Sequence, residues 1–198
     1  MTIGGDTESL VYSRPVVEFA TVAKEFCAYI ESTNRLTRQQ FVQAASKLLG
    51  LLYYKASLLP RVEPIYGEGI QRHVAEEDYQ RVHSSLRSLM GPHDDFAEVF
   101  DPRVSEVDEP FSATISEYLA DVYQDLKNFT GNYQAGHTGE MNDALWECKL
   151  NFEEYWGIRL ANTIRAIHLL AYGSADLSEP NESESQDIPH GLGRDTSK

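Results

Sequence analysis

Two aspartates and one arginine, distant in the sequence, have the types and spacing of a charged site between helices. Asp121 and Asp125 lie four residues apart, which places both carboxylates on one face of a helix. Arg159 falls inside the apolar sector of a later periodic segment, where its guanidinium needs an acidic partner. The pattern predicts that Arg159 meets Asp121 or Asp125 where the two segments pack together.

Two interpretations of this cluster stay open. A buried ion pair between two helices can act only to fix their register. Alternatively, the helices enclose a polar pocket for an anionic or zwitterionic small molecule, and the candidate ligand-binding residues are then Asp121, Asp125, Arg159, Asn162 and His168. His168 falls beside apolar positions, where a histidine is either a hydrogen-bonded core residue or an acid–base group.

Other catalytic and metal-binding motifs are missing from the sequence. There is no Glu-x-x-His or His-Glu-x-x-His metal motif, no Gly-x-Ser-x-Gly nucleophile turn and no glycine-rich phosphate loop. The run His93-Asp94-Asp95 resembles the doublet of metal-dependent phosphohydrolases, but directly after Gly91-Pro92 it fits an N-cap in a loop better. The sequence therefore predicts no metal site and no cofactor.

The charge and the cysteine content narrow the class of protein. The 198 residues include 17 basic and 31 acidic side chains, a formal net charge of -14 that repels nucleic acid and anionic membranes. Cys27 and Cys148 are far apart and form no metal-binding pair, which favours two reduced thiols. The first residues show no signal-peptide pattern, and the apolar run 48–59 is shorter than the about 20 residues that span a bilayer. We therefore expect a cytoplasmic protein that binds neither nucleic acid nor membranes.

Five segments with helical periodicity must position the candidate residues. Each carries apolar residues at every third or fourth position and is bounded by capping residues, proline or glycine. They run from Ser13 to about Ile30, from Thr37 to Leu59, from Glu76 to Met90, from Ile115 to Gly131 and from Glu140 to Tyr172. Thr37 and Gln40 match a capping box. Gly157 costs the last helix about 1 kcal/mol relative to alanine, so we expect another helix to approach closely there.

These segments predict an all-α fold, a single-domain helical bundle of about five helices around a long central C-terminal helix. We expect an N-terminal extension over 1–12, an all-helical domain over 13–173 and a disordered acidic tail over 174–198. The tail prediction rests on composition, because so polar a segment buries too little apolar surface to offset its ordering entropy. Prolines and glycines predict loops over 60–76 and between the third and fourth helices.

Four stretches of the sequence resemble one protein family. They are FATVAKEFCAYI (19–30), LLYYKASLLP (51–60), DVYQDLKNF (121–129) and FEEYWGIRLANTIRAIHL (152–169). Over residues 15–172 the chain resembles an uncharacterised bacterial family known as domain of unknown function 5063, above all in the pair Trp156-Gly157 followed by Arg165 and His168. The resemblance implies an all-helical fold in a bacterial, cytoplasmic protein, and it carries no activity.

The leading functional hypothesis is a binding or interaction module, because no catalytic constellation stands out. Its helices would present a surface to a protein partner or a pocket to a small anionic ligand. The alternative is an enzyme that acts on a phosphorylated or other anionic metabolite through Asp121, Asp125, Arg159 and His168. That alternative requires the four groups to converge on one cleft. The oligomeric state stays open.

Overall fold

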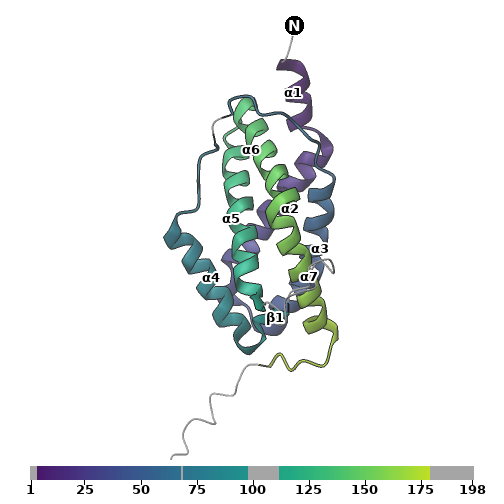
Figure 1. Cartoon of the computed structure of the whole chain (residues 1–198), viewed down its shortest axis with the longest axis vertical. Coiled ribbons are helices and arrows are strands. Elements are labelled where there is room, and N and C mark those ends of the chain that lie inside the picture. Colours follow the sequence, from purple (N-terminus) through teal and green to yellow (C-terminus); the bar gives the residue numbers. More distant parts are fainter. Residues whose placement is uncertain (1–3, 68, 98–111, 179–198) are drawn as a thin grey trace, which may run out of the picture.

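The computed structural model describes residues 4–67, 69–97 and 112–178 as a helical bundle (Figure 1). Its helices are α1 (Gly4–Val11), α2 (Arg14–Glu31), α3 (Arg38–Ser57), α4 (Glu76–Met90), α5 (Ile115–Gln134), α6 (Thr138–Asn151) and α7 (Gly157–Tyr172). A π-helical segment, Phe152–Trp156, joins α6 to α7, and two short 3₁₀ turns occupy Thr33–Arg35 and Gly91–His93. The predicted all-α fold is confirmed. The structure adds a two-stranded antiparallel sheet of β1 (Asp95–Ala97) and β2 (Ser112–Thr114).

Helix α1 was not predicted. It lies within the predicted N-terminal extension, and the hydroxyl of Tyr133 on α5 donates to the carbonyl oxygen of Val11 at 2.7 Å. Val11 is fully buried, so the end of α1 is part of the packed bundle.

Local signals set several helix ends where they were predicted. Thr37 and Gln40 form the capping box that opens α3: the Thr37 hydroxyl accepts from Gln40 N, and the Gln40 side chain accepts from Thr37 N. Helix α4 has the predicted bounds and stops at Gly91, whose φ of 53° favours glycine. Ser13 occupies the N-cap of α2 without a side-chain capping bond, and its buried hydroxyl has no partner among the described residues.

The prediction that Gly131 ends the fourth helix is wrong. Helix α5 continues to Gln134, and the turn that follows uses Gly136 at a φ of 79°. A Cβ at position 131 would lie 2.4 Å from Cδ2 of His73. The glycine inside the helix therefore serves the close approach of the segment that contains His73.

The long C-terminal helix is present, but one stretch of it is wound as a π-helix. Gly157 N donates to the carbonyl oxygen of Phe152, the i to i+5 bond of a π turn. A Cβ on Gly157 would lie 2.2 Å from that oxygen. The expectation of another helix at Gly157 is wrong, because the close neighbour belongs to the same helix.

The core forms around α5 and the long helix beside it. Helix α5 packs against α2, α4, α6 and α7, while α3 packs against α2 and α7 (Figure 1). The largest fully buried side chains include Trp156, Phe19, Phe26, Phe41 and Phe129. No helix among the described residues is long and apolar enough to cross a membrane.

The C-terminal segment is ordered farther than predicted. Residues 174–178 fold back on the bundle. Arg38 Nη1 donates to the carbonyl oxygen of Ser178 at 3.2 Å. A ring nitrogen of His93 lies 2.9 Å from the carbonyl oxygen of Asp176. Leu177 packs against the core. The prediction of disorder from residue 174 is therefore wrong for these five positions. The rest of the predicted tail, 179–198, and the loop over 98–111 lie outside the described residues.

Candidate functional site

The predicted ion pair between Arg159 and an aspartate is confirmed. Arg159 Nε, at the start of α7, lies 2.8 Å from Asp121 Oδ2 on α5. Two phenols donate to the same carboxylate, Tyr79 from α4 at 2.9 Å and Tyr155 from the π segment at 3.0 Å. One carboxylate therefore joins α4, α5, the π segment and α7.

Aromatic rings hold the guanidinium of Arg159 in place. Its Cζ lies 4.0 Å from the ring centroid of Tyr155 and 5.1 Å from that of Tyr118. Burial and the neighbouring Asp121 charge raise the pKa of Tyr155 to about 12 and that of Tyr79 above its ordinary range. Both phenols thus remain protonated donors at neutral pH. This geometry fits an ion pair that fixes the relative positions of four elements.

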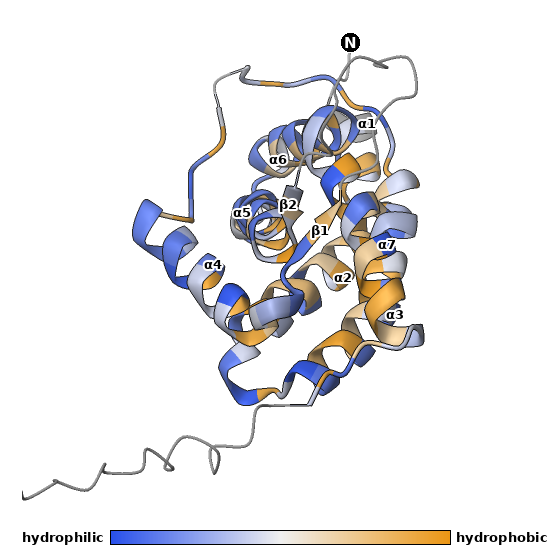
Figure 2. Cartoon of the chain, turned by 60° about the horizontal axis from the view of Figure 1, so that its bottom comes forward, coloured by the Kyte–Doolittle hydropathy of each residue, from blue (hydrophilic) through white to orange (hydrophobic). Residues whose placement is uncertain are grey.

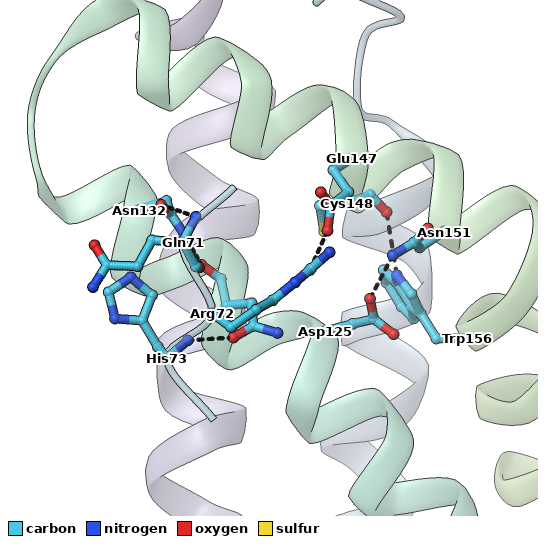
Figure 3. Close-up of polar contacts among 10 residues, drawn as sticks. Gln71, Arg72, His73, Asp125, Asn132, Glu147, Cys148, Asn151 and Trp156 are labelled. Atoms are coloured by element: carbon cyan, nitrogen blue, oxygen red, sulfur yellow. Dashed lines mark hydrogen bonds and ion pairs between the residues drawn. The ribbon is translucent and has the colours of Figure 1, made fainter. Parts of the chain in front are cut away.

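Asp125 belongs to a separate contact, one turn farther along α5. Asn151 Nδ2, at the end of α6, donates to Asp125 Oδ1 at 2.7 Å (Figure 3). Burial, with a smaller contribution from the charge of Glu147, raises the pKa of Asp125 to about 6, although the bond from Asn151 opposes the shift. The structure therefore gives the two predicted aspartates different partners.

The raised pKa of Asp125 predicts a stability that depends on pH. The folded chain holds this proton more tightly than the unfolded chain, so the contribution of Asp125 to wild-type stability falls as pH rises from about 4 to about 6. Asp125→Asn is expected to raise the free energy of unfolding at pH 8 by about 3 kcal/mol. At pH 4 we expect no gain, since the amide oxygen still accepts from Asn151. Urea unfolding at pH 4, 6 and 8 measures both effects.

The matched control for this prediction is Asp78→Asn. Asp78 is exposed, and its bond from the Arg81 side chain lowers its pKa, the opposite direction. This variant should gain no stability at pH 8. A gain of equal size at pH 4 and pH 8 for Asp125→Asn would show that ionisation is not the cause.

The structure does not bring His168 to the aspartates. Its side chain is exposed, and its ring contacts that of Tyr172 at a centroid distance of 4.9 Å, so the prediction of an apolar setting is wrong. Asp125 is bonded to Asn151, and His168 lies 17 positions after Asn151 along the long helix, roughly 25 Å of axis. Asn162 lies half-buried on α7, one turn beyond Arg159. The enzyme hypothesis loses its convergent site.

A polar feature that the sequence did not reveal lies farther along the same stripe of α5, at Asn128 and Asn132. Residues 60–67 and 69–75, which we call the strap, lie between α3 and α4 in the chain and run over the hairpin of α5 and α6 (Figure 1). The side-chain amide of Asn132 accepts from Gln71 N at 3.2 Å and donates to Gln71 O at 2.8 Å (Figure 3). Asn128 Oδ1 accepts from His73 N at 2.7 Å. The strap backbone thus hydrogen-bonds to helix side chains instead of to a neighbouring strand.

Helix α6 binds the first half of the strap in the same way. Asn142 Nδ2 donates to the carbonyl oxygen of Glu63 at 2.7 Å. The carboxylate of Asp143 accepts from Ile65 N at 2.6 Å and from Tyr66 N at 2.8 Å. Asn128 and Asn132, four residues apart on α5, are buried, and buried amides must be hydrogen-bonded, but their burial is not visible in the sequence.

Two ion pairs fasten the strap at its outer side. Arg72 bonds to Glu147 on α6, where Figure 3 shows its side chain reaching across from the strap. Arg61 lies 3.2 Å from Glu153 in the π segment. Both arginines are largely exposed, so solvent screens each pair and it contributes little to stability. The buried amide bonds therefore carry most of the attachment.

Between the strap and the hairpin lies a cavity of about 270 Å³, which we call the strap pocket. It is lined by Tyr66, Gly69, Ile70, Gln71, His73, Gly131, Asn132, Ala135, Glu140 and Asp143. Glycines let the strap approach the hairpin. A Cβ at position 139 would lie 2.4 Å from the Tyr66 hydroxyl, and a Cβ at position 131 would be equally close to the ring of His73. The pocket is thus built from strap rings over helix glycines, with two acidic side chains in its wall.

Asp143 is the unusual member of this wall. Its residue is only 4% exposed, and its carboxylate takes N–H donors from Ile65, Tyr66 and Asn142. No lysine, arginine or histidine within the described chain forms an ion pair with it. A buried carboxylate without a cationic partner is costly, and here its charge faces a cavity.

Comparisons with known proteins agree with the fold and add no activity. A crystal structure of protein BF1032 from Bacteroides fragilis, a structural genomics target, matches with a TM-score of 0.74 and 38% sequence identity. The match covers 84% of this chain and 98% of that chain. No curated protein matches the sequence. The family model described as domain of unknown function matches residues 11–173. The chain therefore belongs to the DUF5063 family.

Proposed function

We propose that this chain is a binding module that takes up a small organic cation, an amine or a methylated ammonium group, in the strap pocket. The observation that carries the proposal is the buried carboxylate of Asp143, which lines the pocket and has no cationic partner among the described side chains. A bound cation would supply the missing counter-charge. Because Asp143 itself is buried, solvent weakens that attraction less than it would at an exposed carboxylate.

The other lining groups suit the same ligand. Glu140 adds a second carboxylate, and no described residue bonds to its side chain. The rings of Tyr66 and His73 form part of the wall, and aromatic faces attract ammonium groups. With about 270 Å³, the cavity is slightly smaller than the roughly 300 Å³ at which sites for drug-sized molecules begin. The ligand is therefore small.

The charge of the whole chain favours a cation over the anionic ligand expected from the sequence. A formal net charge of -14 raises the local concentration of cations and steers them inward. An anionic ligand would depend on Arg159, but Arg159 Nε already donates to Asp121. We therefore assign the small-molecule site to the strap pocket.

Isothermal titration calorimetry with choline, putrescine and the uncharged choline isostere 3,3-dimethyl-1-butanol tests the proposal. We expect at least one of the two cations to bind with a Kd below about 1 mM, and the uncharged isostere not to bind. Glu140→Gln should weaken that cation about fivefold, and Ala135→Trp, which fills the cavity, should abolish binding.

Glu77→Gln is the matched control, because Glu77 lies in the first turn of α4 as Glu140 lies in that of α6. It should leave the Kd unchanged. The proposal is overturned if neither cation binds, or if the isostere binds as tightly as choline.

We also propose that the module works in the reducing cytoplasm. Cys27 and Cys148 are both free and buried, as expected of thiols that are never oxidised. Burial raises the pKa of each thiol above its ordinary value, so neither is a reactive thiolate. Recovery of the native protein in a membrane or secreted fraction would contradict this placement.

A further inference from the structure

The acidic residues are unevenly distributed over the molecule. None of the 31 aspartates and glutamates falls within residues 32–62 or 155–175. These two stretches contain α3 and α7, which pack against each other and lie side by side at the right of Figure 2. A chain with a net charge of -14 therefore has two neighbouring helices that carry no carboxylate side chain of their own.

The same two helices expose large apolar side chains. On α3 and its C-cap these are Leu51, Tyr53, Tyr54 and Leu58, and on α7 they are Ile158, Leu169 and Tyr172. Their exposed fractions range from 39% to 68%. Together the seven side chains offer on the order of 700 Å² of exposed surface, distributed along both helices. We call this surface the α3–α7 face.

We propose that the α3–α7 face is the contact surface of a homodimer. A standard-size interface buries roughly 800 Å² on each partner, close to the exposed area of this face. Because most homodimers are symmetric, the same face would meet itself across a two-fold axis. Two chains that each carry a net charge of -14 repel one another through their carboxylates. A contact through helices that carry no acid brings the fewest carboxylates close together.

The basic side chains of the two helices do not prevent such a contact. Arg38 is buried, Lys55 pairs with Glu18 at 2.6 Å and Arg159 pairs with Asp121. Lys47 and Arg165 are the exposed bases of the two helices, and both stand on long side chains that can turn to solvent. The charged side chains of the two helices are thus few.

Sedimentation equilibrium of the full chain from about 5 to 200 µM tests the proposal. We expect a mass that approaches twice the 22.3 kDa of one chain. Raising NaCl from 50 to 500 mM should tighten the dimer severalfold, because salt screens the repulsion between the acidic bodies. Leu51→Glu and Ile158→Glu should each shift the equilibrium to monomer by tenfold or more.

Val17→Glu is the matched control, since Val17 is 44% exposed on α2, outside the face. It should leave the dimer intact, and circular dichroism should show all three variants folded. A monomer at every concentration and salt, or a dimer unaffected by both Leu51→Glu and Ile158→Glu, overturns the proposal. Weakening of the dimer by salt would overturn it as well, because it would indicate association through opposite charges.

Discussion

Replacing Asp121 by alanine is expected to lower the free energy of unfolding by about 3 kcal/mol, the lower end of the cost of breaking a buried ion pair. The carboxylate accepts from Arg159, Tyr79 and Tyr155, and all three donors would lose their acceptor. The lower end applies because the Arg159 side chain keeps 26% of its surface in water. Urea unfolding followed by circular dichroism at pH 7 measures the loss.

Two further variants separate the ion pair from a general effect of mutating α5. Glu117→Ala removes an exposed acid one turn earlier on the same helix and should change stability by less than about 0.5 kcal/mol. The double variant Asp121→Ala with Arg159→Met should recover at least half of the loss, since no charge is then left unpaired. If the double variant is no more stable than Asp121→Ala alone, the carboxylate does not act through Arg159.

Much of the helical framework could be predicted because its signals are local. The capping box of Thr37 and Gln40 and the proline after Leu59 act within one turn of the chain, so they appear directly in the sequence. Gly131 misled the prediction, because a glycine that ends a helix and a glycine that admits a neighbour look alike in sequence. Only the position of His73 distinguishes the two.

The candidate site was predictable only in part, for a related reason. Arg159 stood out because a charge on an apolar face demands a partner, and Asp121 was one of two candidates. The hydrogen bonds to the strap left almost no signal, since loops have no periodicity and Asn128 or Asn142 reads as an ordinary polar position. That an asparagine side chain hydrogen-bonds to the backbone of the strap can be recognised only when the course of the strap is known.

The π segment marks the limit of projecting the long helix at 100° per residue. A π turn acts as one residue inserted into an α-helix, so everything after it rotates by about 100° against everything before it. A single helical projection therefore cannot give the faces of both parts of the long helix. The residues up to Asn151 and those from Gly157 onward need one projection each. Tyr155 lies inside the insertion, and this is how it reaches Asp121 together with Arg159. The prediction for Arg159 used one projection of the whole segment, and it was correct because the buried Thr163 and Ala166 of α7 by themselves place Arg159 on the buried side.

The last prediction concerns the glycine that permits this turn. Gly157→Ala is expected to lower the free energy of unfolding by about 2–3 kcal/mol, although alanine favours helices by about 1 kcal/mol. The new Cβ would lie 2.2 Å from Phe152 O and 2.9 Å from Cδ2 of the Phe152 ring, so a backbone atom would have to move. Relaxing to an ordinary α turn would remove the clash, but it would rotate Arg159 away from Asp121. Both routes cost stability.

The same substitution at Gly50 should have the opposite sign. Gly50 lies in the interior of α3, and no atom lies within 4 Å of the position that its Cβ would take. Gly50→Ala should therefore raise the free energy of unfolding by up to about 1 kcal/mol through helix propensity alone. Urea unfolding of both variants measures the difference, and near-ultraviolet circular dichroism reports on the buried Trp156 beside the turn. If Gly157→Ala stabilises the chain as Gly50→Ala does, the long helix has no π turn at Phe152, and the shared placement of Tyr155 and Arg159 around Asp121 needs another explanation.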